Sequence, residues 1–155
     1  MMSRNISREQ KQPENEPSEL VFECYITDGL GRYGELIFPK KADLDILPDD
    51  WPDNLFRGSL NFYINSYGYP PYFNGQNFQK VDDKQFPAAF IIPQDKIGDN
   101  TLGPEEGNPE KGTAQVWRCS VFIHKSGQTF TAWVVRRIGS AYEDVIELVS
   151  DKILR

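Results

Sequence analysis

Two oxygen-bearing side chains stand two positions apart in the segment Arg57–Asn61. Ser59 and Asn61 flank an apolar residue, so on a strand both side chains would project from one face. A hydroxyl oxygen and an amide oxygen are ligands that a hard cation accepts. The same alternation is typical of the solvated side of an ordinary strand, and the pair alone does not separate the two interpretations.

A single carboxylate, Glu147, interrupts the apolar run Val145–Val149. Alternation along a strand would allow this side chain to face solvent, which is the usual position of a glutamate. Arg136 and Arg137 are two adjacent cations near the end of another apolar segment. On a strand, one of them would point to each face.

Gly29–Gly34 has the form G-x-G-x-x-G and follows a strand-like segment. A dinucleotide-binding fingerprint must open a helix, whereas here a strand-like run ending at Pro39 follows. A protein-kinase glycine-rich hairpin is excluded because no HRD or DFG motif follows. The segment is either a plain tight turn or a strand turn whose backbone N–H groups approach an anion, with Arg32 adding positive charge.

Residues suited to nucleophilic or soft-metal chemistry are few. His124 is the single histidine and is expected to be a solvated residue at a strand end rather than a member of a catalytic triad. Cys24 and Cys119 lie in separate apolar segments without a CxxC motif, which predicts buried free thiols. The aromatic cluster Tyr67–Phe73 either stacks on a flat ring or packs its loop against the core.

Short alternating segments predict a chain built mainly from strands. The expected strands are Val21–Thr27, Tyr33–Phe38, Ser59–Asn65, Pro87–Ile92, Ala114–His124, Gln128–Ile138 and Val145–Val149. Gly127 can provide the turn of a hairpin between the two longest of them. Leu47–Gly58 and Pro93–Gly112 are expected to be loops because proline, glycine and aspartate recur in them. This pattern favours an all-β fold, a small barrel with long loops.

The chain has 155 residues, which suits one domain, and a formal net charge of −6. Residues 1–20 lack aromatic residues and mix charges with prolines, so we expect a disordered tail and then a single β-barrel domain over residues 21–155. The acidic balance argues against nucleic acid or an anionic membrane as the partner. No membrane-spanning run or secretion signal is found, so a cytoplasmic protein is expected.

Four short segments, taken in order, carry a resemblance to a known family. They are Gly29–Tyr33 (GLGRY), Phe56–Asn61 (FRGSLN), Trp133–Ser140 (WVVRRIGS) and Val145–Arg155 (VIELVSDKILR). This order resembles the archaeal CTP-dependent riboflavin kinases, which have a Gly-x-Gly turn, a Gly-Thr-Leu-Asn stretch and a late Ile-Glu strand followed by a Leu-Arg pair. The similarity extends over roughly residues 21–155.

The resemblance implies a six-stranded cradle-loop β-barrel that transfers the γ-phosphoryl group of CTP to riboflavin, giving FMN and CDP with magnesium as the cofactor. In such a site Ser59 and Asn61 would ligate Mg²⁺, while Glu147 would face the ribityl chain and orient the attacking hydroxyl or take its proton. Ser140 is a further candidate for contact with that hydroxyl. The nucleotide would be held by Gly29, Gly31, Arg32, Tyr33, Lys152, Ile153, Leu154 and Arg155.

Three features differ from that family. Ser59 stands where the family has threonine, which keeps the oxygen ligand. The family continues beyond its Leu-Arg pair into a barrel-closing strand, and it has no clear counterpart of the segment Pro93–Gly112. The alternative function is therefore that of a non-catalytic β-barrel module, which would use the loops Tyr67–Phe73 and Pro93–Gly112 to bind a small molecule or a partner protein.

Overall fold

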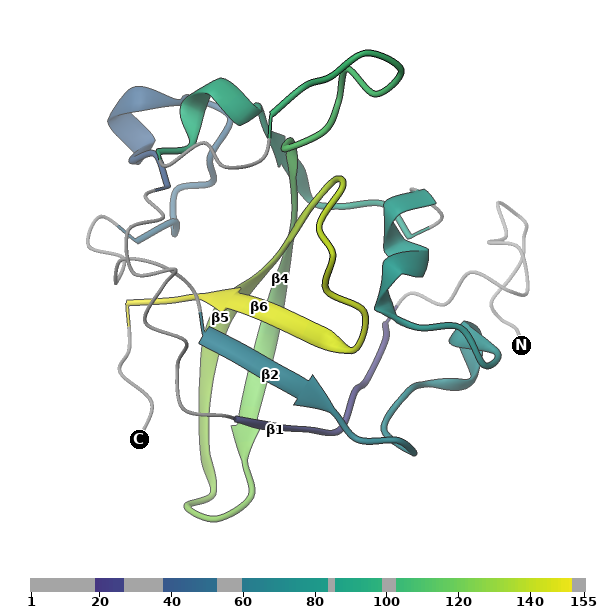
Figure 1. Ribbon diagram of the computed structural model, residues 1–155. Helices are drawn as coiled ribbons and strands as arrows, with labels where there is room; N and C mark the ends of the chain where they lie inside the picture. Colours follow the sequence, from purple (N-terminus) through teal and green to yellow (C-terminus); the bar gives the residue numbers. More distant parts are fainter. Residues whose placement is uncertain (1–18, 27–37, 53–59, 84–85, 99–102, 152–155) are drawn as a thin grey trace, which may run out of the picture.

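Six antiparallel strands form one sheet in the computed structural model (Figure 1), which describes residues 19–26, 38–52, 60–83, 86–98 and 103–151. The strands are β1 (Cys24–Ile26), β2 (Leu60–Ile64), β3 (Phe90–Ile92), β4 (Ala114–Ile123), β5 (Gln128–Arg137) and β6 (Val145–Val149). Short 3₁₀ helices span Lys41–Asp43, Pro71–Phe73, Phe78–Asp83 and Gln94–Lys96. The described part of the chain is therefore all-β, as the alternation predicted.

Each of these strands lies within a segment predicted from the sequence. The β4–β5 hairpin pairs over its whole length, from Ala114 opposite Arg137 to Ile123 opposite Gln128. Gly127 has a φ of 74° in the turn and donates its N–H to the carbonyl of Ile123, which explains the glycine at this position. The predicted strand Tyr33–Phe38 lies outside the described residues except for Phe38, which is buried.

The sheet is curled but open. Its strand order is β1-β2-β6-β5-β4-β3, and β1 and β3 form its two edges. Figure 1 shows the long β4–β5 hairpin crossing β2 and β6 at a steep angle. β6 pairs with the stretch Trp133–Val135 of β5, near one end of the hairpin. The closed barrel expected from the sequence is therefore not formed by these six strands, because β1 and β3 do not pair.

Both faces of the sheet carry a hydrophobic core. Trp133, Val135 and Val149 project from one face into a cluster that the segment 38–51 covers with Phe38, Leu47 and Trp51. On the other face a second cluster is covered by the segment 69–81; its buried members are Phe62, Ile64, Phe73, Phe78, Val81, Ala132, Ile146 and Leu148. Leu20, in the tail predicted to be disordered, packs against this second cluster, and residues 1–18 lie outside the described residues.

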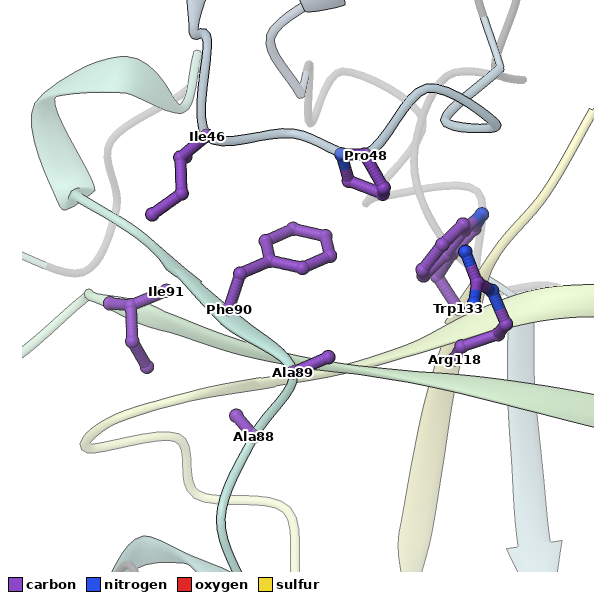
Figure 2. A pocket seen from close by; sticks show the side chains of 8 residues that line it. All are labelled: Ile46, Pro48, Ala88, Ala89, Phe90, Ile91, Arg118 and Trp133. Atoms are coloured by element: carbon purple, nitrogen blue, oxygen red, sulfur yellow. The ribbon is translucent and has the colours of Figure 1, made fainter.

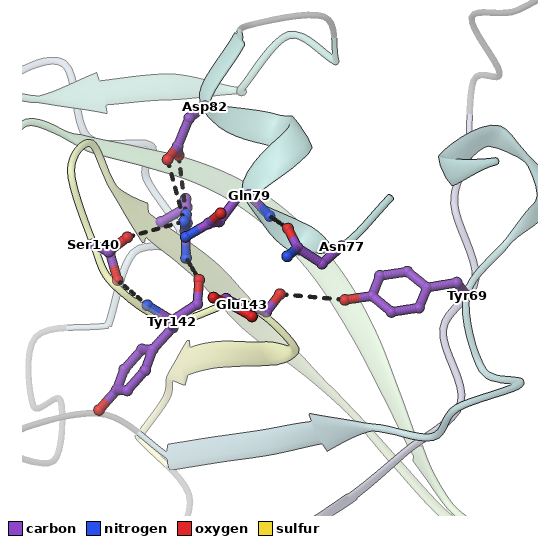
Figure 3. A network of polar contacts seen from close by, with 8 residues as sticks. Tyr69, Asn77, Gln79, Asp82, Ser140, Tyr142 and Glu143 are labelled. Carbon is purple, nitrogen blue, oxygen red and sulfur yellow. Dashed lines mark hydrogen bonds and ion pairs between the residues drawn. The ribbon is translucent and has the colours of Figure 1, made fainter. Parts of the chain in front are cut away.

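A buried arginine connects the sheet with the 3₁₀ helix that follows the aromatic loop on the second face (Figure 3). Arg136 is 1% exposed, and its guanidinium donates to both carboxylate oxygens of Asp82, with N–O distances of 2.9 and 3.1 Å. The same guanidinium donates to the carbonyls of Tyr142, at 2.7 Å, and Ser140, at 3.2 Å. One side chain of β5 thus holds both the 3₁₀ helix Phe78–Asp83 and the loop before β6.

Removing the carboxylate of this ion pair should weaken the fold strongly. We expect Asp82→Ala to lower the free energy of unfolding by about 3 kcal/mol, because it leaves a buried guanidinium without its counter-charge. Urea denaturation measures the change. The control is Glu105→Ala, which removes the 57% exposed partner of Lys111 and should cost less than about 1 kcal/mol. Equal losses in the two variants would contradict the structural role of Asp82.

Candidate functional site

Two of the residues singled out in the sequence are direct neighbours across the sheet. Asn61 on β2 lies opposite Glu147 on β6. Side chains of directly opposite residues project from the same face, with Cβ atoms about 5 Å apart. Asn61 is 2% exposed and Glu147 is 9% exposed. The structure therefore places an amide and a carboxylate side by side in a buried position.

The burial of Glu147 differs from the solvent-facing position that alternation suggested. β6 lies in the interior of the sheet between β2 and β5, and all five of its residues are buried. Glu147 lies opposite Val135, on the face that also carries Val149 and the first hydrophobic cluster. Because both faces of β6 are covered, alternation along this strand separates two cores rather than core and solvent.

A third polar group, Arg137, belongs to the same face. It follows Val135 by two positions on β5, so its side chain projects on the side of Glu147. Arg137 is 4% exposed, and its Nε donates to the carbonyl of Gly112 at 2.9 Å. Arg136 and Arg137 do point to opposite faces, as predicted. The sequence did not connect Arg137 with Glu147, since their proximity depends on the β5–β6 register.

The amide oxygen of Asn61 is the unsatisfied atom of this site. Oδ1 is buried and accepts no hydrogen bond from the part of the chain that the structure describes. A buried acceptor without a partner costs about 1–3 kcal/mol, so its retention points to a ligand that supplies the missing contact. A divalent cation or a ligand N–H or O–H group would satisfy it.

The donor set suits magnesium better than a soft metal. Asn61 offers a hard amide oxygen, and Mg²⁺ is commonly held by one or two protein groups together with substrate phosphates. The described residues contain no cluster of three or more histidine, cysteine, aspartate or glutamate side chains that could hold a metal ion. Asn61 Oδ1 could therefore serve as a single protein ligand to such a cation.

The remaining predicted site residues fall into two groups. Ser140 lies in the loop after β5, where its Oγ accepts the N–H of Tyr142 at 3.3 Å and its carbonyl accepts from Arg136. These contacts (Figure 3) belong to the Arg136 network, on the other face of the sheet from Glu147. The others lie outside the described residues: Ser59, Gly29, Gly31, Arg32, Tyr33, Lys152, Ile153, Leu154 and Arg155.

The aromatic loop Tyr67–Phe73 packs mainly against the core. Phe73 is fully buried, and Tyr69 and Tyr72 pack on the second cluster, whereas Tyr67 is 95% exposed. Tyr69 donates its hydroxyl to Asp144 Oδ1 at 2.8 Å; burial and this carboxylate raise the pKa of the phenol above its usual value. Of the two interpretations of the loop, packing therefore holds for most of its rings.

The two cysteines are free, as predicted, and half-buried. Burial raises the pKa of the Cys24 thiol to about 11, with a further contribution from Glu23. Burial likewise raises the pKa of the Cys119 thiol to about 11. Both groups are therefore protonated at neutral pH, the state of an inert structural thiol.

Comparison of the chain with protein-family models, with curated proteins and with solved structures finds no match. Within the described ranges, no helix has the length and apolar character needed to cross a membrane. The candidate site consequently rests on the geometry of Asn61, Glu147 and Arg137.

Replacing Asn61 by leucine should leave the fold intact. We expect Asn61→Leu to keep the free energy of unfolding or to raise it by about 1 kcal/mol, because the change removes a buried acceptor that has no partner. Thermal and urea unfolding of the two proteins measure the difference. A loss as large as that expected for Asp82→Ala would show that the amide is structurally required.

Both thiols should react slowly in the folded protein. Because the raised pKa values disfavour deprotonation, the thiolate fraction at pH 8 should be about a hundredfold lower than for an exposed cysteine. Colour release from a disulfide reagent such as dithionitrobenzoate measures the rate, and Cys119→Ser isolates Cys24. The same protein in urea should react rapidly. Rapid reaction of the folded protein at pH 8 would contradict the assignment.

Proposed function

We propose that the protein is a magnesium-assisted phosphotransferase of the riboflavin kinase type, which transfers the γ-phosphoryl group of CTP to riboflavin. The observation that carries the proposal is the buried pair Asn61 and Glu147, with an unsatisfied amide oxygen next to a carboxylate. Phosphoryl transfer requires mainly alignment, a divalent ion and positive charge near the transferred group. In the proposal the curled sheet is part of a cradle-loop barrel.

Glu147 would act on the attacking hydroxyl. Its side chain is buried between Asn61 and Val135 on the neighbouring strands, where little water enters and an accepted hydrogen bond is strong. In this role the carboxylate accepts a hydrogen bond from the ribityl hydroxyl and directs the hydroxyl oxygen toward the γ-phosphorus atom. It takes the proton as the O–P bond forms and CDP leaves.

Asn61 and Arg137 would help to stabilise the negative charge of the phosphate groups. Asn61 Oδ1, together with the hydroxyl of Ser59, would hold Mg²⁺, and the ion would neutralise the negative charge of the CTP phosphates. Arg137 is fixed by its hydrogen bond to the carbonyl of Gly112, so its guanidinium is preorganised on the face that carries Glu147. A fixed cation at this position would stabilise the negative charge of the transferred phosphoryl group.

The remaining parts of the proposal rest on the resemblance. The glycine turn Gly29–Tyr33 and the segment Lys152–Arg155 would hold the nucleotide. The partners are then riboflavin and FMN, CTP and CDP, in a cytoplasmic setting.

A second candidate function belongs to a different class. The chain would be a non-catalytic module that binds a small molecule or a partner protein. An apolar groove beside β3 supports this alternative, because its lining includes neither Asn61 nor Glu147. In this case the buried polar pair would have no catalytic role.

The direct test is formation of FMN from riboflavin, Mg²⁺ and CTP, followed by chromatography, with ATP in a parallel reaction. We expect CTP-dependent FMN formation. Glu147→Gln keeps the shape of the side chain but removes its basicity, so the rate should fall by about a hundredfold or more. Glu143→Gln is the matched control; it changes an exposed acid close in sequence and should retain the wild-type rate.

The metal assignment has its own readout. Asn61→Ala should lower the rate most at limiting Mg²⁺ and recover part of it as the metal concentration rises, since the variant loses one ligand. Absence of FMN with either nucleotide from folded protein would reject the enzyme function. Equal rates for the wild type and Glu147→Gln would reject the role of this carboxylate.

A further inference from the structure

A groove of about 470 Å³ lies between the loop before Trp51 and the β3 edge of the sheet. Figure 2 shows Ile46 and Pro48 on the loop side and Ala88, Ala89, Phe90 and Ile91 on the β3 side. Trp133 and Arg118, which lie opposite each other on β5 and β4, complete the lining. Ile46 is 56% exposed and Ile91 is 40% exposed, so apolar surface remains open to solvent along both walls.

Aromatic rings pack against one another at the base of this groove. Trp133 packs against Phe90 and Trp51, with ring centroids 5.8 and 5.2 Å away, and Trp51 also contacts Phe90 at 5.7 Å. Trp51 is fixed by the hydrogen bond that its Nε1 donates to the carbonyl of Pro39, at 3.0 Å. Preformed apolar walls of this kind suit a flat hydrophobic body.

Arg118 is the charged residue in the lining. Its guanidinium lies over the Trp133 ring, 4.9 Å from the ring centroid, which orients it. Its Nη2 donates to Asp50 Oδ1 at 2.6 Å. The side chains of Arg118 and Asp50 are both about half exposed, 52% and 54%, so solvent screens this ion pair and it contributes little to stability.

We propose that this groove binds a small aromatic carboxylate, with the ring against the apolar walls and the carboxylate on Arg118 in place of Asp50. A planar guanidinium recognises a carboxylate through two parallel hydrogen bonds, whereas Asp50 has one contact with it in the structure. The ring would gain apolar contact with Ile46 and Phe90, which Asp50 does not provide. Asp50 therefore competes with the ligand for one cation.

This proposal is independent of the riboflavin kinase function. The groove shares no lining residue with the polar group of Asn61, Glu147 and Arg137. The two proposals can therefore be rejected separately, because FMN formation tests the role of Glu147 and ligand binding tests the role of Arg118.

An NMR titration with 2-naphthoate tests the groove on the full chain. We expect saturable shifts of the Trp133 indole N–H and the Arg118 Nε–H signals, with Trp133→Phe used to assign the indole. Arg118→Gln should weaken binding about tenfold or more, because it removes a charge-assisted pair. Asp50→Asn should strengthen binding about two- to fivefold, because it removes the competing carboxylate.

The neutral analogue 2-naphthalenemethanol is the matched probe, since it has the same ring but no charge, and it should bind wild-type protein about tenfold more weakly. If Arg118→Gln does not fold, Asp50→Asn and the neutral probe still decide the question. Absence of saturable shifts, equal binding of the acid and the alcohol, or weaker binding by Asp50→Asn would each overturn the proposal.

Discussion

The position of β6 in the interior of the sheet is the constraint on which the rest of the structure depends. Segments that cover both faces exclude water from every residue of this strand. The buried Ile146 and Leu148 stabilise one core and Val149 the other. The carboxylate of Glu147 has two polar neighbours on its face of the sheet, Asn61 on β2 and Arg137 on β5.

Local patterns in the sequence predicted the strands well and their partners poorly. Alternation or short apolar runs identified β2, β4, β5 and β6, and Gly127 identified the hairpin turn, because these signals arise from neighbouring residues. The pairing of β2 with β6 joins segments far apart in the chain, and no local pattern encodes that register. Closure of a barrel likewise depends on distant edges, and the described strands leave those edges apart.

In the candidate site, too, residue types could be predicted from the sequence and long-range contacts could not. Asn61 and Glu147 were recognisable by residue type and by the resemblance, whereas the burial of Glu147 was not predicted, although the nearly continuous apolar run Val145–Val149 is the pattern of a strand covered on both faces. Arg137 was noted but could be linked to Glu147 only through the β5–β6 ladder. Arg118 and Trp133 lie in neighbouring strands with no motif in common, and the groove they line forms only when the 38–51 segment folds over them.

The β4–β5 hairpin also has a kinetic consequence. Its ten residue pairs join neighbouring parts of the chain, so little loop entropy is lost when it forms, whereas β2 reaches β6 only after a long loop has closed. Hairpin formation is therefore the natural early step of folding, and it supplies the strand on which β6 later docks. The register set at Gly127 pairs Val135 with Val116, whereas Val135 meets Glu147 only when β6 docks on β5, so the buried polar group is assembled after the hairpin rather than by it.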